Sequence, residues 1–212
     1  MSAGGRLFAT YHHKGLQFGL CLADVNFWEE ALSSEPADRQ LPIGRQHTGT
    51  LGALPPGEGV GFTQEVQWRT DTVLSFRETR EISVNEAPGK YVWTWRSTLV
   101  AARNVEILTS VWPGPGYCGL GLRLARDLFE DGEVSPPGTR SGSIPTSVSY
   151  QGKGAEVGFA QDAQQANALF VSYYGPGGAF AFMSLGPTNR EPRALAKGQR
   201  LEGTYVVTVA DR

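Results

Sequence analysis

Residues 72–100 read TVLSFRETREISVNEAPGKYVWTWRSTLV and are the strongest indication of the fold class. Apolar and polar residues alternate on both sides of Ala87-Pro88-Gly89-Lys90, and proline followed by glycine is typical of a tight turn. Alternation with a period of two indicates a strand with one buried face, because a helix would repeat every 3.6 residues. The stretch therefore predicts a hairpin of two long antiparallel strands, over 72–84 and 91–100.

The same texture of short β-prone runs, broken by Gly, Pro, Asn and Asp, extends along the chain. Further strands are predicted over 61–70, 104–111, 117–125, 146–150, 155–159, 168–174, 179–185 and 203–209. Short helices are expected only at 26–32 and 162–167, and a polar surface loop at 131–146. We therefore expect one all-β domain over residues 1–212, an antiparallel β-sandwich or a closed sheet.

Composition excludes several classes of protein. The 212 residues are 40% hydrophobic, enough for a sizeable core, and the net charge of -2 includes no basic stripe that would bind nucleic acid. No apolar run approaches the roughly 20 residues that span a bilayer, and no apolar leader follows Met1. Together with two cysteines, Cys21 and Cys118, in apolar runs, this predicts a cytoplasmic protein with reduced, buried thiols. The abundance of Gly, Pro and Arg suggests a bacterial source, and no cofactor-binding motif is present.

Two strands place polar residues where apolar ones are expected. In residues 74–82, Glu78 and Arg80 fall on the same face as Leu74 and Ile82. A charge buried on such a face is costly unless it is paired or functional. Glu78 and Arg80 are therefore expected either to line a cavity or to form a structural ion pair where the strand twists toward solvent.

In residues 117–125, Gly119 and Gly121 share a face with Tyr117 and Arg123. Glycine weakens a strand unless something approaches it closely. Either a ligand lies over these glycines with Tyr117 and Arg123 beside it, or a bulge or packed segment of the chain takes the space.

All three histidines lie in the first quarter of the chain, at His12, His13 and His47. Histidine suits proton transfer near neutral pH and also binds metals. Adjacent His12 and His13 would point to opposite faces of a strand, so only one of them can join His47. A metal site with Glu78 or Glu65 would lack any tight ligand spacing, so general acid–base work or hydrogen bonding to hydroxyl groups is the preferred interpretation. Structural or surface histidines are the alternative.

Several motifs carry a family resemblance across nearly the whole chain. They are His-Lys-Gly-Leu-Gln at 13–17, Asn-Phe-Trp at 26–28, Gly-Arg-Gln-His at 44–47, Tyr-Cys-Gly-Leu at 117–120 through Arg123, Phe129 with Gly132, and the ending from Gly198 to Ala210-Asp211. In this order they resemble a bacterial family that carries the automatic label "methane oxygenase PmoA". The resemblance implies a β-sandwich similar to galactose mutarotase-like folds, which hold sugars on a concave sheet with His and carboxylate side chains.

By that similarity His13 and His47 form the central polar pair, with Asn26, Trp28 and Arg123 around them. Members of the family carry several strands before the His-Lys-Gly segment, whereas this chain starts almost on it. We therefore expect one wall of the site to be missing or to come from another subunit of a homo-oligomer. The segment 33–41 also lacks the Gly-rich form usual in the family.

The preferred function is sugar binding or sugar conversion by an enzyme of the isomerase, epimerase or lyase type. Trp28 or Tyr117 would stack on the sugar, His13 or His47 would exchange a proton, and Glu78 or Glu65 would be the complementary base. Lys14, Asn26, Arg80 and Arg123 complete the expected substrate ligands. No metal or cofactor is expected, and the partner is a small molecule.

Two alternatives remain open. The first is a secondary-metabolism cyclase or isomerase with an apolar pocket, supplied with aromatic side chains by Trp68, Trp93, Trp95 and Trp112. The second is a non-catalytic assembly subunit, in which an unpaired sheet edge associates with another chain.

Overall fold

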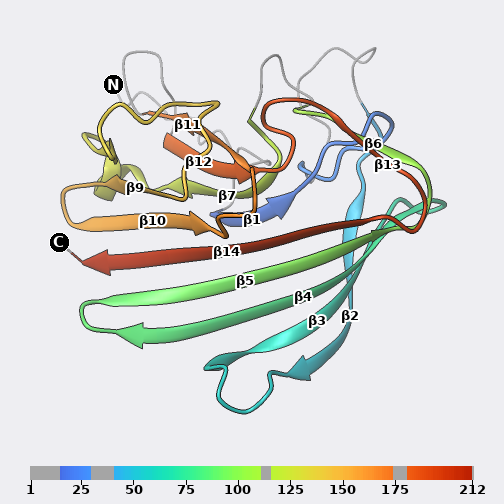
Figure 1. Cartoon of the computed structure of the whole chain (residues 1–212), viewed down its shortest axis with the longest axis horizontal. Helices are drawn as coiled ribbons and strands as arrows, with labels where there is room; N and C mark the ends of the chain where they lie inside the picture. Colours follow the sequence, from blue (N-terminus) through green and yellow to red (C-terminus); the bar gives the residue numbers. More distant parts are fainter. Residues whose placement is uncertain (1–14, 30–40, 111–115, 174–180, 212) are drawn as a thin grey trace, which may run out of the picture.

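A computed structural model describes residues 15–29, 41–110, 116–173 and 181–211, and Figure 1 shows that strands build nearly all of it. The larger of its sheets has eight strands in the order β2-β3-β4-β5-β14-β10-β9-β8. Their bounds, in that order, are Arg45–Ala53, Val60–Arg69, Leu74–Ala87, Lys90–Ala101, Arg200–Asp211, Ala155–Gln161, Ser147–Gln151 and Glu133–Ser135. Every neighbouring pair in this sheet is antiparallel.

The smaller sheet has four antiparallel strands in the order β1-β7-β12-β11. Their bounds are Leu16–Gly19, Gly119–Leu124, Ala181–Gly186 and Ala168–Ser172. A third pair joins β6 (Val105–Ile107) to β13 (Arg193–Leu195), and α1 (Arg126–Phe129) is a single helical turn. None of the helical segments that the structure describes has the length and apolarity needed to cross a membrane.

The small sheet packs on one face of the large sheet, and their facing side chains form a common core. Leu120 and Leu185 of the small sheet belong to the same buried cluster as Trp68, Phe159 and Tyr205 of the large one. Each fully buried side chain of this size stabilises the fold by roughly 1.5–3 kcal/mol relative to exposure. The predicted all-β, antiparallel β-sandwich is confirmed.

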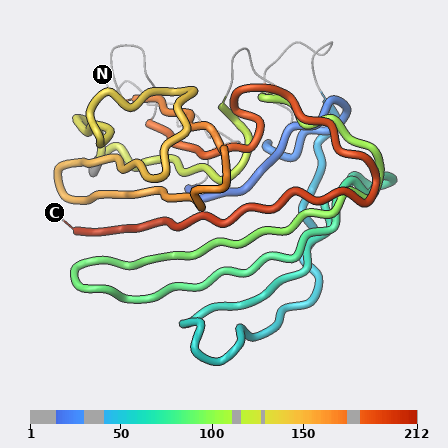
Figure 2. The backbone as a smooth tube through the Cα atoms, in the orientation of Figure 1, coloured from blue at the N-terminus to red at the C-terminus, as the bar shows by residue number. Residues whose placement is uncertain are grey.

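The hairpin predicted from residues 72–100 is the centre of the large sheet. Strands β4 and β5 pair from Phe76 opposite Ala101 to Ala87 opposite Lys90, and Figure 2 traces them as one long hairpin with β14 beside β5. At the turn, Gly89 has a φ of 72°, a backbone conformation that glycine adopts without a steric penalty. The observed strand β4 begins two residues later and ends three residues later than predicted.

The second predicted helix is wrong, and so is the part of the first that the structure describes, while residues 30–32 lie outside the described residues. In residues 26–29, Asn26 forms a bridge with Ile43 and the chain bends at Trp28. The second, at 162–167, is a turn in which Asp162 Oδ1 accepts a hydrogen bond from the Gln164 backbone N–H at 2.9 Å. Asn and Asp side chains often offer the backbone such a local partner and so compete with a helix.

The segment 131–146 is less irregular than a surface loop. It contains β8, and Ser141 Oγ both donates to the Val171 carbonyl and accepts from the Val171 N–H, at 3.1 and 2.9 Å. The strand predicted at 104–111 is also shorter than expected, because only β6 has strand geometry within the described part of that range.

Candidate functional site

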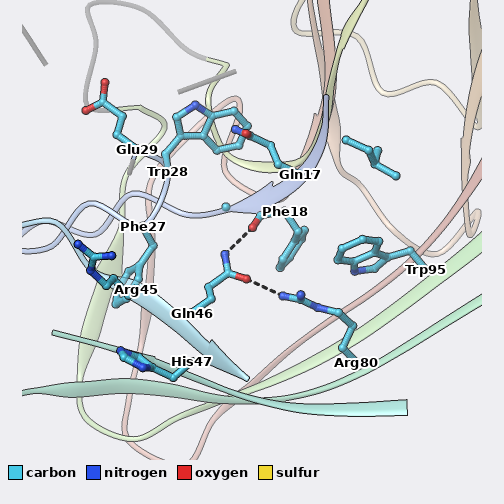
Figure 3. Close-up of a pocket in the computed structure, with 13 residues that line it drawn as sticks. Gln17, Phe18, Phe27, Trp28, Glu29, Arg45, Gln46, His47, Arg80 and Trp95 are labelled. Carbon is cyan, nitrogen blue, oxygen red and sulfur yellow. Dashed lines mark hydrogen bonds between the residues drawn. The ribbon is translucent and has the colours of Figure 1, made fainter. Parts of the chain in front are cut away.

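A hollow of about 730 Å³ opens between the edge strand β1 and the large sheet, beside the segment 27–29 (Figure 3). Its floor is formed by the start of β2 and the middle of β4 and β5. Its lining residues are Leu16, Gln17, Phe18, Gly19, Phe27, Trp28, Glu29, Gly44, Arg45, Gln46, His47, Arg80 and Trp95. Amide, guanidinium, carboxylate, imidazole and indole groups therefore surround one space, to which five separate parts of the chain contribute.

Gln46 connects the two sheets at the floor of this hollow. Its Nε2 donates to the Phe18 carbonyl at 2.7 Å, and its Oε1 accepts from Arg80 Nη2 at 2.7 Å. Figure 3 shows both bonds. Sequence reasoning did not select Gln46, although it lies in the motif Gly-Arg-Gln-His, because the local pattern of β2 does not show which of its residues face inward.

Glu78 and Arg80 point to the same side of β4, as predicted, and form a buried ion pair. Arg80 Nε and Nη2 donate to Glu78 Oε1 and Oε2 at 2.9 and 2.7 Å. Trp68 Nε1 donates to Oε2 and Ser97 Oγ donates to Oε1, both at 2.7 Å. The Glu78 side chain is fully buried and accepts four hydrogen bonds, and these bonds compensate for its loss of contact with water. It holds Arg80 in place from below the hollow.

Arg80 also stacks on Trp95. Its guanidinium carbon lies 4.8 Å from the centre of the Trp95 ring, within the range of a cation–π contact. Its side chain keeps 11% of its surface exposed, and that surface lines the hollow. The sequence left two alternatives open, a pair that lines a cavity and a structural ion pair. Both describe part of what is found, since Glu78 is the buried anchor of the ion pair and Arg80 lines the hollow.

Asn26 supports the opposite wall of the hollow from behind. Its Oδ1 accepts hydrogen bonds from the backbone N–H groups of Trp28 and Glu29 at 2.8 and 3.2 Å, and its Nδ2 donates to Glu29 Oε2 at 2.7 Å. The Asn26 side chain does not belong to the lining, whereas Trp28 and Glu29 do. Asn26 is thus a positioning residue for Trp28, and its role as a direct substrate ligand stays a prediction.

His47 lies at the rim of the hollow on the edge strand β2, where it is exposed. Gln46 faces inward, so its neighbour His47 points to the other face of the strand. Glu65 lies on β3, opposite Thr79 of β4, and is likewise exposed on the outer face. The other predicted residues of the His-rich segment, His12, His13 and Lys14, lie outside the described residues, and so does Trp112.

Within the described ranges, no three His, Cys, Asp or Glu side chains come together as a metal site.

Tyr117 and Arg123 do not line the hollow. The Tyr117 ring lies behind Trp28, with ring centres 5.9 Å apart, and burial raises the pKa of its hydroxyl. Arg123 on β7 pairs with Phe182 of β12, and its backbone N–H donates to the Gly15 carbonyl at 3.2 Å. Their predicted role in binding substrate stays a prediction.

The two glycines beside them are approached closely, as predicted, and protein atoms take the space. A Cβ at Gly119, where φ is 93°, would lie 2.3 Å from the Leu185 carbonyl oxygen. A Cβ at Gly121 would lie 2.5 Å from the ring of Phe182. Of the two predicted alternatives, the packed segment of chain is therefore the correct one.

Both cysteines are free and buried, as predicted. Thr188 Oγ1 donates to Cys118 Sγ at 2.8 Å, and burial raises the pKa of the Cys118 thiol to about 11. Burial outweighs the hydrogen bond from Thr188, which by itself lowers the pKa, and a buried, protonated thiol packs as a small apolar group.

A comparison with functionally curated proteins found no match. A protein-family model covers residues 5–212, almost the whole chain and all of the lining described above. The chain belongs to the family of unknown function DUF6807.

Proposed function

We propose that this chain binds a sugar in the hollow beside β1, and that any conversion it performs there is a proton transfer of the isomerase or epimerase type. The observation that carries the proposal is the Gln46–Arg80–Trp95 arrangement at the floor. It offers an amide and a guanidinium next to an indole ring. A pyranose presents the matching surface, because its hydroxyl groups lie around the ring edge and its C–H groups form an apolar face.

The polar lining favours a sugar over the apolar substrate of a cyclase. Ligand sites for apolar molecules are mostly hydrophobic with a few placed polar groups. Here Gln17, Glu29, Arg45, Gln46 and Arg80 contribute polar groups to a single space. The resemblance to the family labelled methane oxygenase PmoA supports the same choice, through the sugar-holding concave sheets of mutarotase-like folds.

Association through the edge strand β2 is less favoured. Its pairing with β3 is interrupted by a bulge between Thr48 and Leu51. Bulges twist an edge away from a flat template and are a common protection against edge-to-edge pairing. An assembly role would therefore use another surface.

Proton transfer is assigned to the histidines of the sequence motifs, His13 and His47. Glu78 is committed to four hydrogen bonds. Among the described residues that line the hollow, the one that carries a carboxylate is Glu29, a buried residue whose Oε2 accepts a hydrogen bond from Asn26 Nδ2 at 2.7 Å. We propose Glu29 in the role of complementary base that was first considered for Glu78.

We also propose a cytoplasmic setting for the protein, with which the free, buried cysteines are consistent.

The test is calorimetric titration of the full chain with aldoses and keto-sugars, with NMR of ring-proton exchange in D2O. Gln46→Ala is expected to weaken sugar binding at least ten-fold, and Gln67→Ala, which faces outward on β3, is expected to leave it unchanged. Arg45→Ala is a second variant for this test. Arg45 is exposed at the rim of the hollow, so this substitution does not put the fold at risk. Saturable binding without exchange would leave a binding protein, and no binding by any sugar would refute the proposal.

A further inference from the structure

Beyond the hollow, β5 carries a row of aromatic side chains on the face that Trp95 occupies. Tyr91 and Trp93 precede Trp95 at alternate positions, so all three point to the same side of the strand. Trp95 is partly buried against the core, Trp93 is 39% exposed and Tyr91 is 55% exposed. Exposure therefore increases stepwise from the hollow toward the hairpin end. We call these three residues the aromatic strip.

The neighbouring strands extend the strip into a flat apolar floor. Register places Ile82 opposite Trp95 and Val84 opposite Trp93 on β4, and Phe62 opposite Ile82 on β3. In Figure 1 the small sheet lies on the side of β14 and β10, while the lower parts of β3 and β2 continue away from it. A sheet face that meets water is normally polar, so this floor is arranged to be covered.

Two charged groups stand at the ends of this floor: Arg80 at the hollow, and Glu86, which lies opposite Tyr91 at the hairpin end. Along the inward face of β4, the positions between Arg80 and Glu86 are Ile82 and Val84. On the other side of β5, Tyr205 of β14 lies opposite Trp95, and Val207 of β14 lies opposite Trp93. Between its two ends the floor offers mainly apolar and aromatic groups, so a neutral ligand with an apolar face fits it better than a charged chain.

The exposed apolar area of the floor is that of a functional patch. The large apolar side chains exposed on this face are Leu51, Val60, Phe62, Tyr91, Trp93 and Val209. With roughly 150–250 Å² for each large side chain, their exposed parts amount to on the order of 500 Å². Functional patches of about 300–600 Å² occur on monomers, and the exposed apolar area of this floor falls within that range.

We propose that the aromatic strip binds the second and following units of a neutral oligosaccharide whose terminal unit occupies the hollow. This inference rests on the proposed sugar site and names its substrate class. Alternate residues of a strand are about 6.8 Å apart, a step comparable to the length of one pyranose unit. Trp95 is shared by the hollow and the strip, so a chain that leaves the hollow passes directly onto Trp93.

The test is calorimetric titration with neutral oligosaccharides of one to six units, from β-1,4-glucan, α-1,4-glucan and β-1,4-mannan series. For one series, affinity is expected to rise at least ten-fold between the monosaccharide and the trisaccharide. Trp93→Ala is expected to remove this gain and leave monosaccharide affinity unchanged. Thr94→Ala is the matched control, since Thr94 neighbours Trp93 on the opposite face of β5. Circular dichroism confirms that each variant is folded.

The outcomes separate this inference from the proposed function. If monosaccharides bind and length adds nothing, the strip is not a sugar site and the hollow remains one. If no sugar of any length binds, both proposals fail. A dimer by light scattering that Trp93→Asp converts to a monomer would show that a second copy covers the strip, and would overturn the inference.

Discussion

The buried carboxylate of Glu78 makes a quantitative prediction about stability. In Glu78→Gln the side chain keeps its volume but loses its charge, and one of its two oxygens becomes an N–H donor. If the new N–H donor replaces Oε2 it faces two donors, Trp68 Nε1 and Arg80 Nη2, and if it replaces Oε1 it faces the donor Arg80 Nε. Arg80 is only 11% exposed, so water replaces little of what it loses.

The magnitude follows from these contacts. Removing one partner of a buried ion pair costs about 3–5 kcal/mol, because the remaining charge stays buried without its counter-charge. Glu78→Gln is expected near the lower end of that range, since the remaining oxygen still accepts hydrogen bonds. Glu78→Leu is expected near the upper end. Replacing both partners, in Glu78→Leu with Arg80→Met, is expected to cost clearly less than the sum of the single changes, since no charge is then left in the core.

Urea unfolding, followed by tryptophan fluorescence, measures these free energies. The matched control is Glu81→Gln on the same strand, where the carboxylate is 36% exposed and lies 3.4 Å from Arg96. Surface pairs of this kind contribute about 0–1 kcal/mol. If Glu78→Gln loses no more stability than Glu81→Gln, or if the double variant is additive, Glu78 does not anchor Arg80 as described.

Three further predictions concern stability. Stability is expected to fall as the pH rises from 9 to 11, because burial raises the pKa of the Cys118 thiol from an ordinary value of 9.0 to about 11. The unfolded chain therefore loses this proton first. Cys118→Ala should reduce the decline by up to about 2–3 kcal/mol in urea unfolding at each pH. Gly121→Ala should cost about 1–3 kcal/mol through its clash with Phe182, and an unchanged urea midpoint would contradict that packing. Asn26→Ala should cost about 1–3 kcal/mol, because two buried N–H groups lose their acceptor, and thermal unfolding equal to wild type would count against this role.

The candidate site was predicted in part. Arg80, Trp28 and His47 do line the hollow, and Asn26 and Glu78 support lining residues from behind. Tyr117 and Arg123 were expected beside a ligand because Gly119 and Gly121 lack side chains, but the space belongs to β12 and Phe182. A glycine pattern shows that something is close and does not show what it is. Gln46 was not selected, because the pattern of β2 does not show which of its residues face inward, and Trp95 was expected only in the apolar pocket of the cyclase alternative.

The sequence by itself did not predict β1, β2, β8 or β13, but it determined most of the strands and which of their residues share a face. This holds because alternation along a strand is a local property, so residues 72–100 alone place Glu78 and Arg80 on one side of β4. Local hydrogen bonding by Asn26 and Asp162 was the main source of error, since it replaces a helix with a turn or a bent segment. Only the tertiary structure decided which strands meet. The bond from Gln46 to the Phe18 carbonyl, and the bond from Arg80 to Gln46, join residues 28 and 34 positions apart. Such contacts depend on sheet order and register, and no single stretch of the chain encodes either one.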